Sequence, residues 1–357
     1  MPTFVALMRR RGYRWVLLAT MALVSLVATA CETTPDPVFV APSGPSATPT
    51  PTPTPADRPD RLRVAAAGDI ACPGAAGPEP SLCRYAATSD LVVPGDIDAV
   101  LMLGDAQYPN SGYRDLLRYY DPTWGRALDK TYPVPGNHEY ETASGEPGGY
   151  FAYFGDRWRG PDGYGYYSFD LPSGCRPKDD LCWHVIALNS ELCVMDTGCT
   201  QEAGSRSPGG QQMRWLSRDL TAHPDVRYPC TIAFFHEPLF HGTRVTEEVR
   251  PLWDLLYSAG ADVVLNGHNH RYERWRRMAP SGIPDPDLGI RQFIVGTGGS
   301  DLESLEGRPP GLAKAQDASF GVLELGLYSN EYTWRWVPAA GQPADFTDVS
   351  ARPTACA

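Results

Sequence analysis

Short runs of apolar residues recur along the chain after residue 60, and each leads into a segment of glycine and polar residues. Four runs have the length of a strand and lack alternating polar positions, which is typical of strands in a sheet covered on both faces. The four predicted strands are residues 62–67, 99–103, 230–235 and 261–265.

Between and after these strands, the pattern changes to that of helices and of a hairpin. Apolar residues share one helix face over 208–222, which predicts a helix that Ser207 and Pro208 open. A second helix is predicted over 251–259, and the aliphatic and aromatic residues of 319–337 predict a hairpin. Strands that alternate with helices, with polar groups where strands end, predict an α/β sandwich with its site at the strand ends.

The first sixty residues differ from the rest of the chain. Four arginines precede an apolar run at 15–30 that ends in small residues, which predicts a signal peptide over 1–30. Sixteen apolar residues are short for a retained membrane span. Cys31 follows directly and resembles the lipidated cysteine of bacterial lipoproteins, with plain secretion as the alternative. The Pro/Thr-rich residues 31–60 predict an extended linker.

The cysteine content fits export. Of nine cysteines, eight remain when Cys31 is set aside for a lipid, and an even number suits disulfides in an oxidising compartment. Eight cysteines permit many connectivities, of which the simplest joins neighbours along the chain. We predict the pairs Cys72–Cys83, Cys175–Cys182, Cys193–Cys199 and Cys230–Cys356. Export predicts a secreted protein, or one anchored by lipid to the outer face of the cell membrane.

Charge narrows the range of partners. The formal charge of the chain is −11, and removal of the four signal-peptide arginines leaves −15. General nucleic-acid binding requires basic patches, so we expect no such surface. Membrane contact is expected only through the signal peptide or a lipid anchor. The folded part is predicted as one catalytic domain at 61–340, followed by a C-terminal tail at 341–357.

Four short motifs in the folded part carry candidate metal ligands. They are Gly68-Asp69, Gly104-Asp105-Ala106-Gln107-Tyr108, Gly136-Asn137-His138-Glu139 and Gly267-His268-Asn269-His270, with His236 between the last two. An aspartate after a glycine is by itself more often a turn residue. Together, however, carboxylates, a phenol, an amide oxygen and imidazoles are the donors that iron, manganese or zinc prefers. His184 and His223 lie outside the motifs and are expected to be structural or on the surface.

The ordered motifs resemble those of the calcineurin-like metallophosphoesterases, and within them the purple acid phosphatase branch. The branch pattern runs Asp-x-Gly, Gly-Asp-x-x-Tyr, Gly-Asn-His-Asp/Glu, Val-x-x-His and Gly-His-x-His. This chain departs from it at Ala71, where the first motif has glycine, and at Ala233, where the fourth has valine. Neither position supplies a ligand. The resemblance implies an αββα sandwich with a dinuclear metal site at the strand ends.

The resemblance also implies a ligand set for two metal ions. One ion would be held by Asp69, Asp105, Tyr108 and His270, and the other by Asp105, Asn137, His236 and His268, with Asp105 bridging the two. Phenol has a pKa near 10, so a tyrosinate ligand suits a trivalent ion. The implied pair is iron(III) beside divalent iron, zinc or manganese.

Two further histidines are candidates for catalysis. In the family, the residue that matches His138 faces the substrate, where imidazole can donate a hydrogen bond to phosphate or a proton to the leaving alcohol. His241, five residues after His236, is a second candidate, with an ordinary loop histidine as the alternative. The glycine-rich segment 296–299 is expected to form a turn near the site.

These inferences predict an exported hydrolase that acts on small-molecule phosphate monoesters by attack of a metal-bound hydroxide. A phosphodiesterase of the same fold is the enzymatic alternative. An inactive binding module at the cell surface is the alternative from a different class.

Overall fold

The computed structural model describes residues 61–72, 83–176, 181–195, 199, 205–224 and 228–356. The predicted signal peptide, Cys31 and the predicted linker lie outside the described residues. Within the described ranges, no helix combines the length and the apolar character needed to cross a bilayer.

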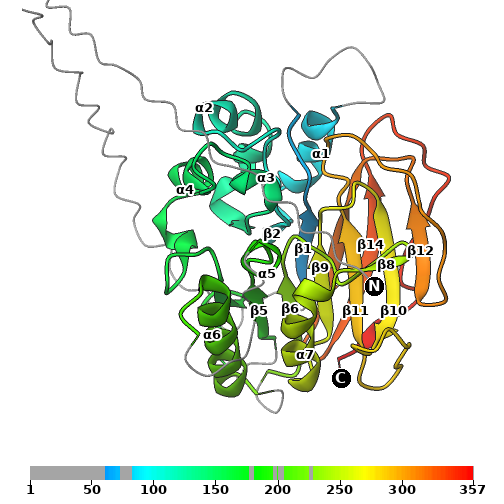
Figure 1. The fold of residues 1–357 in the computed structure, drawn as a ribbon. Helices are drawn as coiled ribbons and strands as arrows, with labels where there is room; N and C mark the ends of the chain where they lie inside the picture. The colour runs from blue at the N-terminus through cyan, green and yellow to red at the C-terminus, as the bar shows by residue number, and fades with distance from the viewer. Residues whose placement is uncertain are drawn as a thin grey trace, which may run out of the picture. The chain divides into compact units, whose positions relative to one another are not determined.

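Two large β-sheets form the centre of the fold (Figure 1). The first has the strand order β15-β14-β13-β1-β2-β3, and the second has the order β12-β10-β11-β9-β6-β5-β4. The strands are β1 Leu62–Ala67, β2 Ala99–Met102, β3 Thr131–Pro133, β4 Tyr167–Leu171, β5 Trp183–Ala187, β6 Thr231–Phe234, β9 Val263–Asn266, β10 Tyr272–Met278, β11 Ile290–Val295, β12 Leu312–Gln316, β13 Gly321–Leu327, β14 Glu331–Pro338 and β15 Thr354–Ala355, and β7 Phe240–His241 pairs with β8 Arg244–Val245.

Helices lie on the outer side of each sheet, which gives the predicted αββα order of layers. The α-helices are α1 Tyr85–Val92, α2 Tyr113–Asp115, α3 Asn137–Tyr140, α4 Gly148–Phe154, α5 Glu191–Val194, α6 Pro208–Ala222 and α7 Arg250–Ser258. Short 3-10 or π-helical segments are η2 Leu116–Tyr120, η3 Trp124–Lys130, η4 Asp156–Arg159 and η5 Glu247–Val249. Helix α6 begins as predicted, because the Ser207 side chain accepts a hydrogen bond from the backbone of Gly210.

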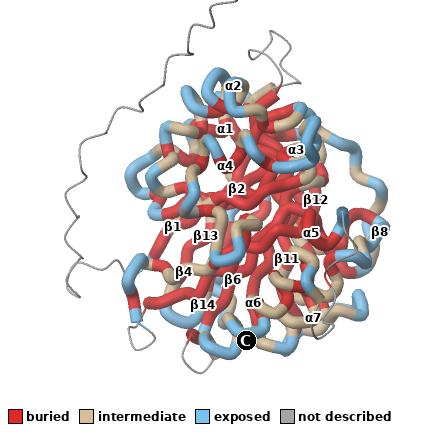
Figure 2. The backbone as a smooth tube through the Cα atoms, turned by 60° about the vertical axis from the view of Figure 1, so that its left-hand side comes forward, coloured by how far each residue is buried: buried red, intermediate tan, exposed pale blue. Residues whose placement is uncertain are grey.

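The alternation of side chains along the strands builds two apolar layers. In β6, Ile232 and Phe234 join a buried cluster that contains residues of both sheets, whereas Ala233 joins a second cluster with residues of α6 and α7. Figure 2 shows this buried interior as continuous red tube through the strands. Because both faces of the central strands are covered, every position of β6 and β9 is buried and nearly all are apolar, as the continuous runs predicted.

The predicted elements are present with small shifts at their ends. The strand at 62–67 and the helix at 208–222 have the predicted bounds, and the hairpin predicted at 319–337 is the antiparallel pair β13 and β14. The segment 341–356, which the sequence assigned to a tail, is packed on the domain. It contributes β15, and the buried Asp348 accepts hydrogen bonds from Tyr272, Arg274 and Trp334.

All four predicted disulfides are present. Three of them, Cys72–Cys83, Cys175–Cys182 and Cys193–Cys199, close short loops. The fourth joins Cys230, directly before β6, to Cys356 after β15, so it links the two sheets.

His184 is structural, as its position outside the motifs suggested. Its Nδ1 lies 3.0 Å from Asp170 Oδ1 and its Nε2 lies 2.9 Å from Asp219 Oδ2, while the ring of His223 stacks on it. Burial opposes a charged imidazole, but the hydrogen bonds to the two aspartates outweigh burial and raise the pKa of His184.

The raised pKa of His184 predicts a pH-dependent contribution to stability. A group whose pKa is higher in the folded state stabilises the fold below its unfolded pKa, and the contribution is lost as the pH rises through the folded pKa. His184→Gln should therefore lower the free energy of unfolding by about 1 kcal/mol more at pH 5.5 than at pH 9. Urea unfolding of both proteins at the two pH values measures this. A difference that is the same at both values would contradict the ion-paired state of His184.

Candidate metal centre

Five of the predicted ligands directly follow parallel strands. Strands β1, β2 and β3 run parallel in the first sheet, and β5, β6 and β9 run parallel in the second. Because the carboxyl ends of parallel strands lie at one edge, the loops that follow them meet there. Asp69 follows β1, Asp105 follows β2, Asn137 follows β3, His236 follows β6 and His268 follows β9.

The glycines of the motifs are required by close packing of these loops. A Cβ atom on Gly136 would lie 2.3 Å from Asp105 Oδ1, and one on Gly104 would lie 2.4 Å from His236 Nδ1. The backbone also turns sharply at three predicted ligands, with φ of 60° at Asp69, 51° at Asp105 and 69° at His268. Non-glycine residues rarely adopt positive φ and do so mainly where the surrounding structure enforces it, often at functional sites.

The first group of donor atoms surrounds the Tyr108 hydroxyl. It lies 3.0 Å from Asp69 Oδ1, 2.8 Å from Asp105 Oδ2 and 2.8 Å from His270 Nε2. His270 Nε2 is also 3.3 Å from Asp69 Oδ1. These four side chains are the set that the sequence assigned to one metal ion.

The second group surrounds the side-chain oxygen of Asn137. Asn137 Oδ1 lies 3.1 Å from His236 Nε2 and 3.2 Å from His268 Nδ1. His236 Nε2 is also 3.3 Å from Asp105 Oδ2, so the Asp105 carboxylate contacts both groups. Asp69, Asp105 and His236 each place one ligand atom within 4.8 Å of the others.

Each ligand histidine has its second nitrogen fixed by an oxygen on the far side. His236 Nδ1 lies 2.7 Å from the carbonyl oxygen of Leu103, His268 Nε2 lies 3.2 Å from Glu237 Oε2, and His270 Nδ1 lies 2.8 Å from Asp301 Oδ1. A nitrogen that donates outward leaves the inward nitrogen of a neutral imidazole with a free lone pair, as metal-binding histidines require. The residues therefore fit a pair of metal ions.

Neighbouring charges shift the pKa values of the donor groups. Burial opposes ionisation of Asp105, but the neighbouring His236 and His138 outweigh burial and lower the pKa of its carboxyl well below the ordinary value. Burial, together with the carboxylates of Asp69 and Asp105, raises the pKa of Tyr108 well above that of free tyrosine. An ionised Tyr108 therefore needs cations beside it, which agrees with a metal-binding role for this donor set.

Glu139, the last residue of its motif, fastens two of the loops together. Its buried carboxylate accepts hydrogen bonds from the backbone of Asp105 and Ala106 at 2.9 Å, and from the backbone of Gly136 at 2.6 Å. The Ser111 hydroxyl also donates to it. Because all these donors belong to the loops after β2 and β3, Glu139 sets the distance between Asp105 and Asn137.

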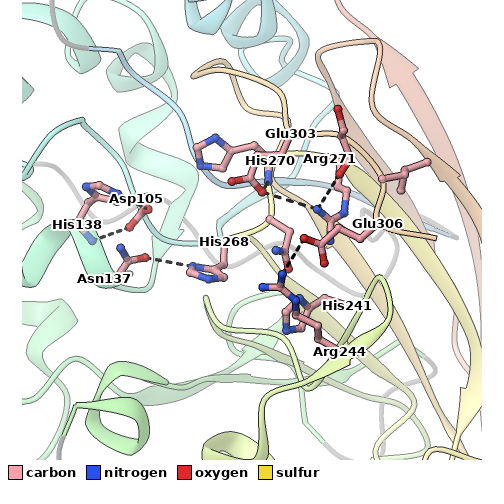
Figure 3. Close-up of a pocket in the computed structure, with 13 residues that line it drawn as sticks. Asp105, Asn137, His138, His241, Arg244, His268, His270, Arg271, Glu303 and Glu306 are labelled. Atoms are coloured by element: carbon pink, nitrogen blue, oxygen red, sulfur yellow. Dashed lines mark hydrogen bonds and ion pairs between the residues drawn. The ribbon is translucent and has the colours of Figure 1, made fainter. Parts of the chain in front are cut away.

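A pocket of about 630 Å³ opens beside the two donor groups (Figure 3). At one end it is lined by predicted site residues, namely Asp105, Asn137, His138, His268 and His270. His138 Nδ1 lies 2.7 Å from the carbonyl oxygen of Pro109, and its Nε2 lies 3.9 Å from Asp105 Oδ2, so the Nε2 edge is on the side of the donor groups. His241 lines the other end, where burial and two arginines lower its pKa to about 4.

The structure brings all nine predicted site residues into one region, seven in the donor groups and two on the pocket wall. The 296–299 turn also lies beside it, because the backbone of Gly298 donates to the carbonyl of Gly68. Sequence reasoning missed Glu237 and Asp301, which hold the outer nitrogens of His268 and His270. Glu237 adjoins His236 and offered a signal as a carboxylate next to a ligand, whereas Asp301 lies in no motif.

The position of Asp301 predicts an effect on metal affinity. Asp301→Ala removes the acceptor of the outer His270 nitrogen, so His270 is no longer held in one tautomer and orientation. Loss of such a partner weakens metal binding by roughly 10–100-fold in other proteins, and the same range is expected here. Calorimetric titration of the metal-depleted protein with Zn²⁺ measures it, with Asp345→Ala at an exposed site as the control. Equal affinity in the two variants would show that Asp301 does not orient the ligand.

Comparisons with known proteins agree with the geometry. A family model for calcineurin-like phosphoesterases matches residues 62–272. The chain is 26% identical over 278 residues to Purple acid phosphatase 18 of Arabidopsis thaliana, a match that covers 71% of this chain and 54% of that protein. It is 25% identical over 270 residues to Fe(3+)-Zn(2+) purple acid phosphatase 12 of the same plant, covering 67% and 53%. The chain thus spans about half the length of these curated relatives.

Solved structures share the fold. Purple acid phosphatase PPD1 from yellow lupin (Lupinus luteus) seeds superposes with a TM-score of 0.60 at 17% identity, over 81% of this chain and 53% of that one. GAP50, the anchor in the inner membrane complex of Plasmodium, gives a TM-score of 0.59 at 13% identity, over 81% and 88%. The family match covers more than half of the chain and includes all seven predicted ligands. The chain therefore belongs to the calcineurin-like phosphoesterase family, and its relatives include purple acid phosphatases.

Proposed function

We propose that this protein is a metal-dependent phosphatase that hydrolyses small-molecule phosphate monoesters. The observation that carries the proposal is the pair of donor groups that share the Asp105 carboxylate, at 2.8 Å from the Tyr108 hydroxyl and 3.3 Å from His236 Nε2. A carboxylate between two sets of imidazole and oxygen donors suits two adjacent cations, because its Oδ2 atom faces both sets.

In this proposal, Asp69, Asp105, Tyr108 and His270 hold one ion, and Asp105, Asn137, His236 and His268 hold the other. We propose iron(III) on the Tyr108 side and divalent iron, zinc or manganese on the Asn137 side. Such a pair of cations neutralises phosphoryl oxygens and makes water acidic enough to act as a nucleophile near neutral pH. The chain itself supplies the fixed geometry, since backbone amides of His138 and His268 hold Asp105 Oδ1 and Asp69 Oδ2 at 3.0 Å.

His138 is the proposed proton donor to the leaving alcohol. The Pro109 carbonyl fixes its Nδ1 proton, so the proton on Nε2 of the imidazolium form is the one available to the pocket. Transfer of that proton to the departing oxygen prevents the build-up of an alkoxide. His241 lines the same pocket and is proposed to contact the substrate away from the donor groups.

The alternative from a different class, an inactive binding module, has some support from GAP50, which shares this fold and is described as an anchor. Fold alone does not decide between a binding and a catalytic role. The intact donor set and the inward-directed nitrogens favour catalysis in this chain. A phosphodiesterase would use the same donor groups, so the choice between ester types rests on the assay below.

We further propose that the protein is exported and acts outside the cell, either free or held by a lipid on Cys31. The basic and apolar pattern of residues 1–30 and the Pro/Thr-rich linker support this proposal. Four disulfides among the described residues fit an oxidising compartment. Contact with a membrane would then occur only through the signal peptide or the lipid, and the acidic chain offers no basis for nucleic-acid binding.

Replacement of the shared carboxylate tests the phosphatase. Asp105→Asn keeps the shape of the side chain but removes its charge, so kcat/KM for p-nitrophenyl phosphate should fall by at least about 100-fold. Asp345→Asn is the matched control on the surface and should leave the rate unchanged. The wild type is also assayed with bis(p-nitrophenyl) phosphate, which has the same leaving group. Faster hydrolysis of this diester would replace the monoesterase by a diesterase, and no hydrolysis of either ester by the metal-loaded protein would refute the enzyme.

Tyr108 gives a spectroscopic test of the iron assignment. A tyrosinate bound to iron(III) absorbs visible light, so the metal-loaded wild type should be coloured and Tyr108→Phe should lose that band while the divalent ion stays bound. Absorption spectra and metal analysis of both proteins measure this. A colourless wild type with two divalent ions would refute iron(III), and an unchanged spectrum in the variant would refute Tyr108 as its ligand.

A further inference from the structure

The pocket has a second wall, away from Asp105 and His138, to which the proposed reaction assigns only a substrate contact by His241. Its buried part consists of His241, Asn269 and Arg271, with exposed fractions of 8%, 9% and 2%. Its outer part contains Arg244, paired with Glu306 at 3.0 Å, and Glu303. Figure 3 shows His241, Arg244, Arg271 and Glu306 on the side opposite Asp105 and His138, with Glu303 next to His270.

The charge of Arg271 is balanced by the carboxylate of Glu273, and the Nη2 group of Arg271 is left unpaired among the described residues. Its Nε donates to Glu273 Oε1 at 2.6 Å, and its Nη1 lies 3.4 Å from the Ser304 carbonyl oxygen and 3.7 Å from Glu303 Oε2. Glu273 is fully buried and also accepts hydrogen bonds from the backbone of Gly242 and from Trp275 Nε1. Arg271 Nη2 is buried and has no hydrogen-bond partner among the described residues. Arg271 thus presents two unpaired N–H groups without a net local charge.

His241 presents a free acceptor. The Thr246 hydroxyl donates its one hydrogen to Glu237 Oε1 at 3.1 Å, so it accepts from His241 Nε2, which is also 3.1 Å away. A proton on Nε2 leaves Nδ1 of the neutral ring as a lone pair. His241 Nδ1 is buried and, within the described part of the chain, unpaired.

Asn269 adds a second acceptor. Its Oδ1 is also buried without a partner among the described residues, and its side chain lines the same pocket. Three residues that line one cavity therefore carry an unpaired donor group and two unpaired acceptors just beneath its surface. Buried polar atoms are nearly always paired in folded proteins, so three unpaired atoms on residues of one pocket wall favour a ligand that pairs with them.

We propose that this wall binds hydroxyl groups of the leaving alcohol, so that the preferred substrates are phosphate monoesters of sugars or polyols. A hydroxyl both donates and accepts, so the hydroxyls of such an alcohol can pair with the donor Arg271 Nη2 and with the acceptors His241 Nδ1 and Asn269 Oδ1. This inference rests on the proposed function only in assigning the phosphate to the metal centre.

Other classes of leaving group fit the wall less well. An apolar group would leave all three buried atoms unpaired, which is costly for binding. A second phosphate or a carboxylate would bring only acceptors towards His241 Nδ1 and Asn269 Oδ1, and negative charge towards Glu303 and Glu306. Sites built to bind a hydroxyl discriminate strongly against analogues that lack it.

The test measures binding apart from turnover. The probes are the methylene phosphonate analogues of glucose 6-phosphate and of cyclohexylmethyl phosphate, which have the same ring size and charge but differ in hydroxyls and cannot be hydrolysed. Calorimetry on the metal-loaded, full-length protein should give a Kd at least about tenfold lower for the sugar phosphonate. Asn269→Leu and His241→Phe should each reduce this ratio towards one, and Gln211→Leu, an amide change on α6 outside the pocket, should leave it intact.

Equal Kd values for the two phosphonates in the wild type, or a ratio unchanged in both wall variants, would overturn the hydroxyl subsite. The same preparations are assayed for hydrolysis of glucose 6-phosphate. Tighter binding of the sugar phosphonate without hydrolysis would refute the phosphatase but support the hydroxyl subsite. Hydrolysis without tighter binding of the sugar phosphonate would support the phosphatase but refute the subsite.

Discussion

The buried carboxylate of Glu139 is the contact on which the candidate metal centre depends. It accepts backbone hydrogen bonds from the loop after β2 and from the loop after β3, and no solvent competes for them. One carboxyl group accepts hydrogen bonds from both loops, so two loops from neighbouring strands are held as one unit. Asp105 and Asn137 are therefore placed by the protein frame, before any ligand contributes.

The protein backbone also offsets part of the free-energy cost of burying the carboxylates of the centre. Asp69 and Asp105 are buried side by side, and isolated buried carboxylates are strongly unfavourable. One oxygen of each is held by a backbone amide, from His268 and His138 respectively, while the other faces Tyr108 and the imidazoles. The outward oxygens are thus satisfied by the fold, and the inward ones remain for cations. In the same way, the unpaired atoms of His241, Asn269 and Arg271 on the second wall of the pocket remain for the hydroxyl groups of a neutral alcohol.

The apolar pattern predicted the strands and a site at their ends, because a buried strand and the polar motif after it are local patterns. The order of layers and the set of seven donor residues followed from the resemblance of the motifs to those of a known family, and the structure brings these seven residues together. The short disulfides were also predictable from spacing. The residues that orient the candidate ligands were not predictable in this way. Asp301 orients His270 from 31 positions away, and Glu237 holds His268 from 31 positions away in the other direction along the chain. Such contacts depend on how loops pack against one another, and the spacing of apolar residues along the chain does not predict that packing.

Strand β1, which leads to Asp69, pairs on one side with β2 and on the other with β13, where Leu62 faces Leu327. The loop that carries Asp69 is further held by backbone bonds to Val295 and Gly298. A nascent chain therefore lacks a finished first half of the centre until more than two hundred further residues have been synthesised, and contacts of such long sequence separation form late. It follows that the Asp69 side of the candidate centre is complete only after the chain as far as β13 has been synthesised.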